Sequence, residues 1–412
     1  MIENPHAHLA ALDLSDPGLY ESGAHVATFD FLRRNIPVFW NQEQNGPGFW
    51  AVTTYAGAVS VYRDPSSFSS QRGIILGSHR WSGDPASGKM LALTDPPRHG
   101  KLREVMAQAF TPKTVARLEA RLREMIGRLV THALELGTCD LVDVIAAPIP
   151  VAAVSEILGV PEADRDWLVK LTRIAFGSAD SEYAVGGSAR AAAGEAHSEI
   201  LAYYLDLVAA KRKAPGDDMV SALALAVIDG QPLTAEEIVL NCDNLTVGGN
   251  ETARHAVAGG LLALIERPDQ WSLLKRNHAL MGSAIEEILR WTSPAMHVLR
   301  TTTREVVIEG QPMQGGADVV VWNISANRDA TAFPNANSFE IMRTPNRHIA
   351  FGIGEHYCIG ASLTRLELRM ALEQVSTRIQ VDLAGRVQPL RSNLVHGLKH
   401  MPVRVTAFPP SN

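Results

Sequence analysis

The feature that most constrains this chain is a single cysteine in a glycine-rich stretch, directly before a run of helix-forming residues. Cys358 lies between Gly352, Gly354 and Gly360, and residues 361–369 then favour a helix. Glycine lets a backbone approach a flat ligand closely and adopt positive φ where a turn needs it. The free N–H groups and partial positive charge at a helix N-terminus favour a thiolate over a thiol. The sequence therefore predicts that Cys358 is a thiolate metal ligand.

Cysteine is too rare in this chain to form the other common thiolate sites. The three cysteines are Cys139, Cys242 and Cys358, so none has a second cysteine at the spacing of a zinc ribbon or a redox CxxC pair. Haem iron with one axial thiolate is the best remaining fit. The alternative is a buried, unreactive cysteine beside a turn. The sparse, odd set of cysteines also favours a reducing cytosol over a disulfide framework, so we expect a cytoplasmic protein.

The overall composition argues against several classes of partner. The 412 residues include 38 Lys or Arg and 44 Asp or Glu, for a formal net charge of −6. We therefore expect no broad cationic surface for nucleic acid or an anionic membrane. Residues 1–8 have neither a cationic nor an apolar signal region, and no apolar run reaches the roughly 18 residues of a membrane span. The 14 histidines form no spacing typical of a separate zinc site.

A second constraint is a long helical pattern interrupted by two adjacent glycines. Thr234 and Glu237 have the spacing of a capping box, and helical periodicity continues from there to about Arg267. About 30 residues at 1.5 Å each would span roughly 50 Å, enough to cross a domain. Gly248 and Gly249 in the middle should cost roughly 1–2 kcal/mol relative to alanines. Because glycines permit a kink and the close approach of a small ligand, they indicate a functional reason for this pair.

Helical periodicity also dominates the remainder of the chain. An amphipathic pattern covers residues 24–40, and its helix should close at residues 35–37. The other predicted helices cover residues 55–63, 115–136, 151–158, 164–174 and 189–211, and short strands are expected at residues 49–53 and 319–322. Residues 66–93 should form a long loop, which is unusual inside a compact domain and often functional. Residues 392–398 are expected to form a hairpin. The pattern indicates a mainly α protein with a small β region.

Residues 351–360 resemble the haem-binding signature of the cytochrome P450 family, Phe-Gly-x-Gly-x-His-x-Cys-x-Gly. Its six fixed positions are matched by Phe351, Gly352, Gly354, His356, Cys358 and Gly360. The resemblance implies the cytochrome P450 fold, a single large helical domain with a small β-rich subregion, over residues 23–412, after an irregular lead-in of residues 1–22. It also implies haem b as the cofactor. Cys358 would be the iron ligand, with Phe351, Gly352, His356 and Gly360 in the cofactor site.

Two further basic positions fit the carboxylates of such a cofactor. His99 and Arg103 are four residues apart, so a helix would present both donors on one face, although a solvated charged face would look the same. The family uses His-x-x-x-Arg here to bind the haem propionates. The resemblance also assigns Arg300 and His356 to the propionates.

The glycine pair belongs to another pattern of the family, Ala/Gly-Gly-x-Asp/Glu-Thr, which Gly248, Gly249, Glu251 and Thr252 match. The resemblance implies that Gly248 lies against the cofactor and that Gly249 allows dioxygen to approach the backbone. Thr252 would then hydrogen-bond the dioxygen and hold a water, and Glu251 would connect that water to solvent as part of a proton relay. The alternative for Glu251 is an exposed helix carboxylate.

Several other positions are assigned by analogy with the family. Glu287 and Arg290, spaced i,i+3, should meet Arg343 in a structural cluster beneath the haem. Candidate substrate contacts are Asn241, Asn244, Leu245, residues 296–298 and residues 394–396. The two asparagines could orient a polar ligand, or they could instead be hydrogen-bonded within the protein.

The resemblance implies a haem-thiolate monooxygenase that uses O2 to hydroxylate a C–H bond of a small, partly polar natural-product intermediate. Electrons would come from a separate ferredoxin or flavodoxin with its reductase, because the chain has no flavin or dinucleotide motif. The excess of arginine over lysine and the many alanines suggest a GC-rich genome such as that of an actinobacterium. The two asparagines and the resemblance to soluble bacterial members of the family suggest secondary metabolism. Three alternatives remain at this point: oxidative C–N or C–C coupling at the same site, a peroxide-dependent enzyme, and a haem-based sensor or ligand carrier.

Overall fold

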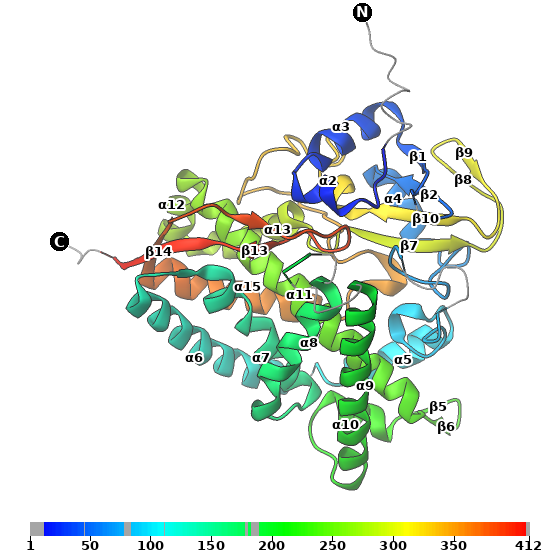
Figure 1. Ribbon diagram of the computed structural model, residues 1–412, viewed down its shortest axis with the longest axis horizontal. Helices are drawn as coiled ribbons and strands as arrows, with labels where there is room; N and C mark the ends of the chain where they lie inside the picture. Colours follow the sequence, from blue (N-terminus) through cyan, green and yellow to red (C-terminus); the bar gives the residue numbers. More distant parts are fainter. Residues whose placement is uncertain are drawn as a thin grey trace, which may run out of the picture.

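Helices make up most of the protein, as a computed structural model of residues 12–44, 46–77, 84–110, 112–177, 180–182 and 189–408 shows (Figure 1). The expectation of a mainly α fold with a small β-rich subregion is confirmed. The helices are α2 (Pro17–Glu21), α3 (His25–Asn35), α4 (Tyr55–Tyr62), α5 (Arg98–Ala107), α6 (Pro112–Leu136), α7 (Pro148–Leu158), α8 (Arg165–Gly177), α9 (Ala189–Lys213), α10 (Met219–Leu225), α11 (Ala235–Ile265), α12 (Pro268–Arg276), α13 (Met281–Thr292), α14 (Asn323–Ala326) and α15 (Ala361–Arg378).

The strands gather mainly beside the N-terminal helices, at the upper right of Figure 1. The largest sheet has the order β1-β2-β10-β7-β3, and only the β2–β10 pair is parallel. Its strands are β1 (Val38–Asn41), β2 (Phe49–Val52), β3 (Phe68–Ser69), β7 (His297–Thr302) and β10 (Asp318–Trp322). A second sheet contains β11 (Ile379–Leu383), β14 (Pro402–Ala407) and β4 (Thr138–Asp140). Three hairpins pair β5 (Val227–Ile228) with β6 (Gln231–Pro232), β8 (Val306–Ile308) with β9 (Gln311–Met313), and β12 (Gln388–Pro389) with β13 (Leu398–His400).

Some expected boundaries need correction. Residues 17–21, inside the lead-in expected to be irregular, form α2, because Asp16 caps the helix by accepting the Gly18 N–H. The helix expected from residue 24 ends at Asn35, within the residues 35–37 where its end was expected, but residues 38–41 at the end of the amphipathic pattern form a strand that pairs with β2. The loop of residues 66–93 contains β3 and a short 3₁₀ turn, Leu91–Leu93, while its residues 78–83 lie outside the described part. The hairpin expected at residues 392–398 pairs β12 with β13, so most of that segment is the connection.

Helix α11 passes through the middle of the molecule and contacts α7, α8, α9, α13 and α15 (Figure 1). The predicted capping box is confirmed: Thr234 Oγ1 accepts the Glu237 N–H at 3.2 Å, and Glu237 Oε2 accepts the Thr234 N–H at 2.9 Å. The helix is 31 residues long. It stays continuous through Gly248 and Gly249 because burial against several helices outweighs the low helix propensity of glycine.

A buried ionic cluster stabilises the region below the Cys358 loop, as the resemblance to the family implied. Glu287 is 0% exposed and accepts hydrogen bonds at 2.7 Å from both Arg290 Nε and Arg290 Nη2. Arg343 Nε donates to the same carboxylate at 3.1 Å. The cluster joins α13 to the segment before residue 351.

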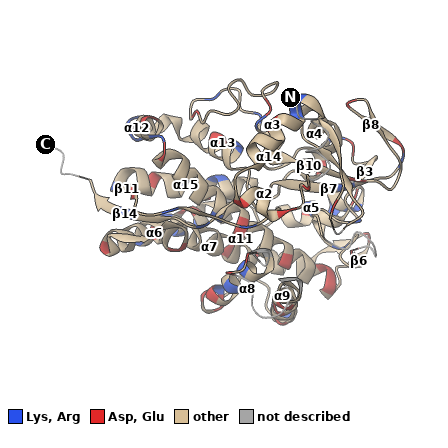
Figure 2. Cartoon of the chain, turned by 45° about the horizontal axis from the view of Figure 1, so that its top comes forward, with Lys and Arg blue, Asp and Glu red and all other residues tan. Residues whose placement is uncertain are grey.

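Charged side chains of both signs are interspersed over the elements (Figure 2). Among the described residues, no helix combines the length and apolar character needed to cross a bilayer.

Candidate active site

The loop that carries Cys358 has the local geometry that its glycines suggested. Gly352 and Gly354 have φ of +68° and +74°, conformations that favour glycine. A side chain at Gly354 would also place its Cβ 2.8 Å from the Tyr62 carbonyl oxygen. Gly360 has φ of −85°, so its conformation does not require glycine. The loop closes where the Cys358 N–H donates to the Phe351 carbonyl at 3.0 Å, and α15 begins three residues after the cysteine.

The Cys358 sulfur borders an internal cavity of about 320 Å³. The side chain is exposed although protein surrounds it, because its sulfur faces this space. Burial raises the pKa of the thiol, while the backbone N–H of Gly360 and the charge of Arg103 favour the thiolate. A bound metal cation would favour the thiolate much more strongly.

Nearly all of the predicted site residues line this one cavity. They are His99, Arg103, Gly248, Gly249, Thr252, Arg300, Phe351, Gly352, His356, Cys358 and Gly360. The exception is Glu251, which is 2% exposed and does not line the cavity. The alternative that Glu251 is an exposed carboxylate is therefore wrong.

Four basic side chains from three separate segments meet at one side of the cavity. His99 and Arg103 come from α5, Arg300 from β7, and His356 from the cysteine loop; the His99 and His356 rings lie 4.2 Å apart. Neither ring nitrogen of the buried His99 has a hydrogen-bond partner. Burial, Arg300 and His99 together lower the pKa of His356 to about 3.

Few acidic side chains balance this basic group. Asp95 acts electrostatically on His99, Arg300 and His356. Its carboxylate already accepts hydrogen bonds from Ser69 Oγ at 2.5 Å and from Ser70 N and Oγ at 2.9 and 2.8 Å. This group combines two arginines with a buried histidine, His99, that lacks hydrogen-bond partners, and such a group is costly unless an anion joins it.

The two glycines of α11 have different surroundings. A Cβ at Gly249 would lie 2.8 Å from Val154 Cγ2, so this glycine allows α7 and α11 to pack closely. A Cβ at Gly248 would meet no atom within 4 Å and would project into open space. Thr252 Oγ1 donates to the Gly248 carbonyl at 2.8 Å, so the oxygen lone pairs of the hydroxyl remain available on the cavity side. This wall of the cavity leaves room for a flat ligand at Gly248.

The predicted substrate contacts divide into two groups. Asn244, Leu245 and Val298 line the cavity. Asn241 does not, because its amide is used within the protein: it accepts the Leu91 N–H at 2.8 Å and donates to the Lys89 carbonyl at 2.9 Å. Met296, His297 and residues 394–396 do not line the cavity either. The backbones of residues 294–296 and 394–396 pair with each other, and the His297 ring contacts the Asn393 carbonyl at 3.0 Å, so these residues join β7 to the loop before β13.

Sequence reasoning missed several lining residues, among them Tyr62, Phe110, Val154, Asn323 and Glu367. Tyr62, Val154 and Asn323 belong to ordinary amphipathic or buried patterns, and only the packing of distant segments brings them to the cavity. Glu367 carried a signal, since it is a carboxylate within the helix that follows Cys358. It is 1% exposed and its Oε2 has no hydrogen-bond partner.

The chemistry of these groups fits iron protoporphyrin. One sulfur faces the cavity, Gly248 leaves room for a flat ligand, and basic side chains that include the unpartnered His99 suit two carboxylates. A sequence profile of the family described as "Cytochrome P450" matches residues 276–402. "Cytochrome P450 NovI" of Streptomyces niveus is 38% identical over 402 residues, which cover 97% of this chain and 98% of that protein.

The chain belongs to the cytochrome P450 family. Linalool 8-monooxygenase of Pseudomonas putida, another P450 relative, is 34% identical and the match covers 95% of this chain and 98% of that protein. The crystal structure of P450 OxyD, involved in the biosynthesis of vancomycin-type antibiotics, superposes with a TM-score of 0.88 at 38% identity, covering 96% of this chain and 100% of that one.

As a cytochrome P450 monooxygenase, the protein binds haem through a cysteine thiolate and uses O2 together with a redox partner protein.

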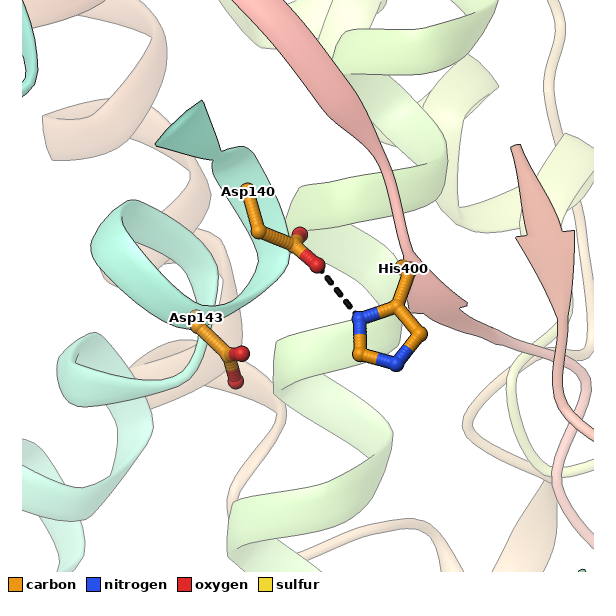
Figure 3. Close-up of side chains that lie close together, drawn as sticks. All are labelled: Asp140, Asp143 and His400. Atoms are coloured by element: carbon orange, nitrogen blue, oxygen red, sulfur yellow. Dashed lines mark hydrogen bonds and ion pairs between the residues drawn. The ribbon is translucent and has the colours of Figure 1, made fainter. Parts of the chain in front are cut away.

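A second group of potential metal ligands lies elsewhere, where β4 meets β13. Asp140, Asp143 and His400 place one ligand atom each within 4.8 Å of one another (Figure 3). His400 Nδ1 is 2.5 Å from Asp140 Oδ2, and Asp143 accepts a hydrogen bond from Arg173 at 2.8 Å. Because existing ion pairs already engage these groups, the arrangement fits a bridge between two elements rather than a metal centre.

Proposed function

We propose that this P450 hydroxylates a C–H bond of a small, partly polar natural-product intermediate, with Cys358 as the iron ligand. The observation that carries the proposal is that Cys358 and Thr252, from segments more than 100 residues apart in the sequence, line one cavity. P450 OxyD, which is involved in the biosynthesis of vancomycin-type antibiotics, supports the link to natural products. Bound haem would supply the reductive activation of dioxygen at its iron.

Each site residue has a role that follows from its position. The Cys358 thiolate would hold the iron and donate electron density to it. His99, Arg103, Arg300 and His356 would bind the two propionates, which provide the anions that this buried basic group lacks. Phe351, Gly352 and Gly360 would shape the loop around the sulfur, and Gly248 would leave space for the ring.

Thr252 and Glu251 would deliver protons to the cavity. The Thr252 hydroxyl donates to the Gly248 carbonyl, so its oxygen can accept a hydrogen bond from a water in the cavity and hold that water in place. Glu251 would receive protons from solvent and pass them toward that water. Gly249 keeps this part of α11 close to α7.

Asn244 is the polar group that we assign to substrate recognition. It lines the cavity and has no hydrogen-bond partner among the described residues, while Leu245, Val298 and Leu289 supply apolar surface. A substrate with an apolar body and one hydrogen-bonding group would fit this wall.

Electrons would come from a ferredoxin or flavodoxin with its reductase. We place its docking face over the cysteine loop, where Arg63 and Arg347 are exposed and could meet an acidic partner.

Two measurements test the proposal. The reduced protein with carbon monoxide should show the red-shifted Soret band of thiolate ligation, and Cys358→Ser should lose it. Thr252→Ala should keep the band but divert at least half of the consumed electrons to peroxide. Labelled dioxygen then separates hydroxylation, which places the label in product, from oxidative coupling, which does not. A wild-type protein without the band, or a Thr252→Ala variant with unchanged peroxide release, would refute the corresponding assignment.

A further inference from the structure

Glu251 and Arg254 of α11 form an ion pair with the same spacing as Glu287 and Arg290 of α13, but with a different geometry. Both pairs are spaced i,i+3 and their side chains are almost fully buried. Arg290 binds its carboxylate with two donors, Nε and Nη2, each 2.7 Å from a different oxygen. Arg254 uses only Nη2, which donates to Glu251 Oε2 at 2.5 Å. The Glu287–Arg290 pair is therefore bidentate, and the Glu251–Arg254 pair is not.

The second donor of Arg254 is buried but has no acceptor. In a guanidinium, Nε–H and one Nη2–H share an edge, and in Arg290 these two donors serve one carboxylate. In Arg254, Nη2 has a further neighbour, His255 Nε2, at 3.1 Å. Arg254 Nε has no hydrogen-bond partner among the residues that the structure describes, although the side chain is only 3% exposed.

An acceptor without a partner lies one helical turn before Arg254. Asn250 is 4% exposed, and its Oδ1 accepts no hydrogen bond from the described part of the chain. Positions i and i+4 are neighbours on a helix surface, so this acceptor and Arg254 Nε lie on the same face of α11. Each such buried group costs about 1–3 kcal/mol when unpaired. A donor and an acceptor left over on one face indicate a shared partner, and buried waters typically make about three hydrogen bonds to such groups.

Glu251 supplies a third contact for a water at this place. Its Oε2 is engaged by Arg254, whereas Oε1 has no hydrogen-bond partner within the described residues. Burial would raise the pKa of Glu251, but Arg254 and other basic neighbours hold it below its usual value, so the group is a carboxylate at neutral pH. A water would accept the Arg254 Nε–H and donate one hydrogen to Asn250 Oδ1 and the other to Glu251 Oε1.

The interface between α8 and α11 connects this cluster with the surface. Asn250, Glu251 and Arg254 do not line the cavity. Arg173 of α8 acts electrostatically on Glu251, and its buried Nε also lacks a partner in the described structure. The rest of the Arg173 side chain is partly exposed and donates to the exposed Asp143, drawn in Figure 3, at 2.8 Å. Solvent can therefore reach the cluster from the α8 side.

We propose that Asn250 Oδ1 and Arg254 Nε hold one buried water against Glu251, and that Glu251 exchanges protons with solvent through this water. The proposal rests on the relay role proposed above for Glu251. In each transfer the water gives one proton to Glu251 Oε1 and takes one from the solvent side, so the water is unchanged and one proton has moved inward. Asn250 is a positioning residue, because it acts only by fixing the water.

Three substitutions on α11 test this role. Asn250→Leu keeps the approximate size of the side chain and removes the acceptor. Asn250→Asp keeps an acceptor oxygen at the same place. Asn241→Leu is the matched control: it removes a buried amide from the same helix, about 13 Å away along the helix axis. That amide binds the backbone of Leu91 and Lys89, so the control lowers stability without touching the cluster.

A crystal structure of the haem-loaded protein, at a resolution that shows ordered waters, tests the site directly. We expect a water within about 3.2 Å of both Asn250 Oδ1 and Arg254 Nε. The same water should be absent from Asn250→Leu. A wild-type structure without this water refutes the proposal, whether or not any variant folds.

Dioxygen consumption in H2O and in D2O measures the role in proton transfer, with a surrogate ferredoxin and reductase supplying electrons from NADH. Asn250→Leu should consume dioxygen about threefold more slowly than wild type and show a larger solvent isotope effect, with the carbon monoxide band intact. Asn250→Asp should recover the rate to within about twofold of wild type. Asn241→Leu should change neither the rate nor the isotope effect.

The outcomes separate this proposal from the relay itself. If the water is present but Asn250→Leu leaves the isotope effect unchanged, the water is structural and its role in the relay is refuted. If Asn241→Leu is as slow as Asn250→Leu, the effect comes from a weakened helix and the proposal is refuted as well. If Glu251→Gln is as fast as wild type, the relay has failed, and with it the role of the water, even where the crystal structure contains the water.

Discussion

Two buried groups of basic side chains, one around Glu287 and one around His99, differ in how completely they are paired. Around Glu287, Arg290 and Arg343 share a carboxylate that also accepts hydrogen bonds from the Glu340 N–H at 2.8 Å and from Asn346 Nδ2 at 3.0 Å. The remaining N–H groups of Arg290 donate to backbone carbonyls of residues 327, 336 and 338, each at 2.9 Å. The group around His99 has no such carboxylate, and both ring nitrogens of His99 lack a partner.

This difference indicates that the Glu287 group stabilises the fold and that the His99 group belongs to a binding site. A buried ion is tolerable when its hydrogen bonds are satisfied, so the Glu287 group is complete without a ligand. The group of His99, Arg103, Arg300 and His356 is complete only when an anion from outside the chain joins it. Removing a residue from the first group should therefore lower the stability of the fold, whereas removing one from the second should weaken cofactor retention.

Glu287→Gln should have the largest effect. It keeps the size of the side chain but leaves two buried arginines without their counter-charge, and we expect the unfolding free energy to fall by about 3–5 kcal/mol. Denaturant unfolding of the haem-loaded protein measures this. Glu340→Gln is the matched control, because Glu340 also approaches Arg343, at 3.5 Å, but its side chain is 41% exposed. That variant should cost less than about 1 kcal/mol, and an equal loss in both variants would contradict the comparison.

His99→Leu should weaken haem retention and change the stability of the fold little. The leucine fills much of the same space and removes two unpartnered ring nitrogens, so we expect little loss of packing stability. Haem should dissociate about tenfold faster, since a charge-assisted hydrogen bond is worth about 1.5–3 kcal/mol. Transfer of haem to excess apomyoglobin measures the rate. His132→Leu, a change at a side chain that is 59% exposed, should leave the rate unchanged. Equal rates for wild type and His99→Leu would refute the propionate assignment.

Glu286→Gln should have the smallest effect on stability, because the ion pairs of Glu286 are only partly buried. Burial alone would raise its pKa, but Arg365 and His348 lower the pKa from 4.5 to about 2. A carboxyl whose pKa is depressed by folding stabilises the protein above its unfolded pKa and loses that contribution as the pH falls toward the folded value. The melting temperature of wild type should exceed that of Glu286→Gln by at most about 2 °C near neutral pH. The difference should shrink as the pH falls from about 5 to 2, and a constant difference would contradict the ion-pair explanation.

Part of the site could be predicted from sequence because its signals are local. The glycines that need positive φ, the cysteine before a helix and the capping box at Thr234 depend on neighbouring residues, and the structure contains all three. The Glu287 cluster was also predicted correctly, but through resemblance to a family and not from spacing, since Arg343 lies 56 residues from Glu287.

Other features could not be predicted because they depend on which distant segments pack together. Asn241 and Asn244 lie on the same helix and look equivalent in sequence. In the structure the side-chain amide of Asn241 is hydrogen-bonded to the backbone of Leu91 and Lys89, whereas Asn244 lines the cavity. The neighbours of Glu251 are local in sequence, but the backbone N–H that donates to His255 Nδ1 at 3.2 Å belongs to Leu398, 143 residues away.

The sequence by itself determined the kind of cofactor site, because ligand type, glycine conformation and helix ends are properties of short segments. Tertiary structure alone decided which buried basic side chains have a carboxylate partner, as around Glu287, and which have none, as around His99. A buried histidine without hydrogen-bond partners, such as His99, arises only from the way elements far apart in the chain pack together.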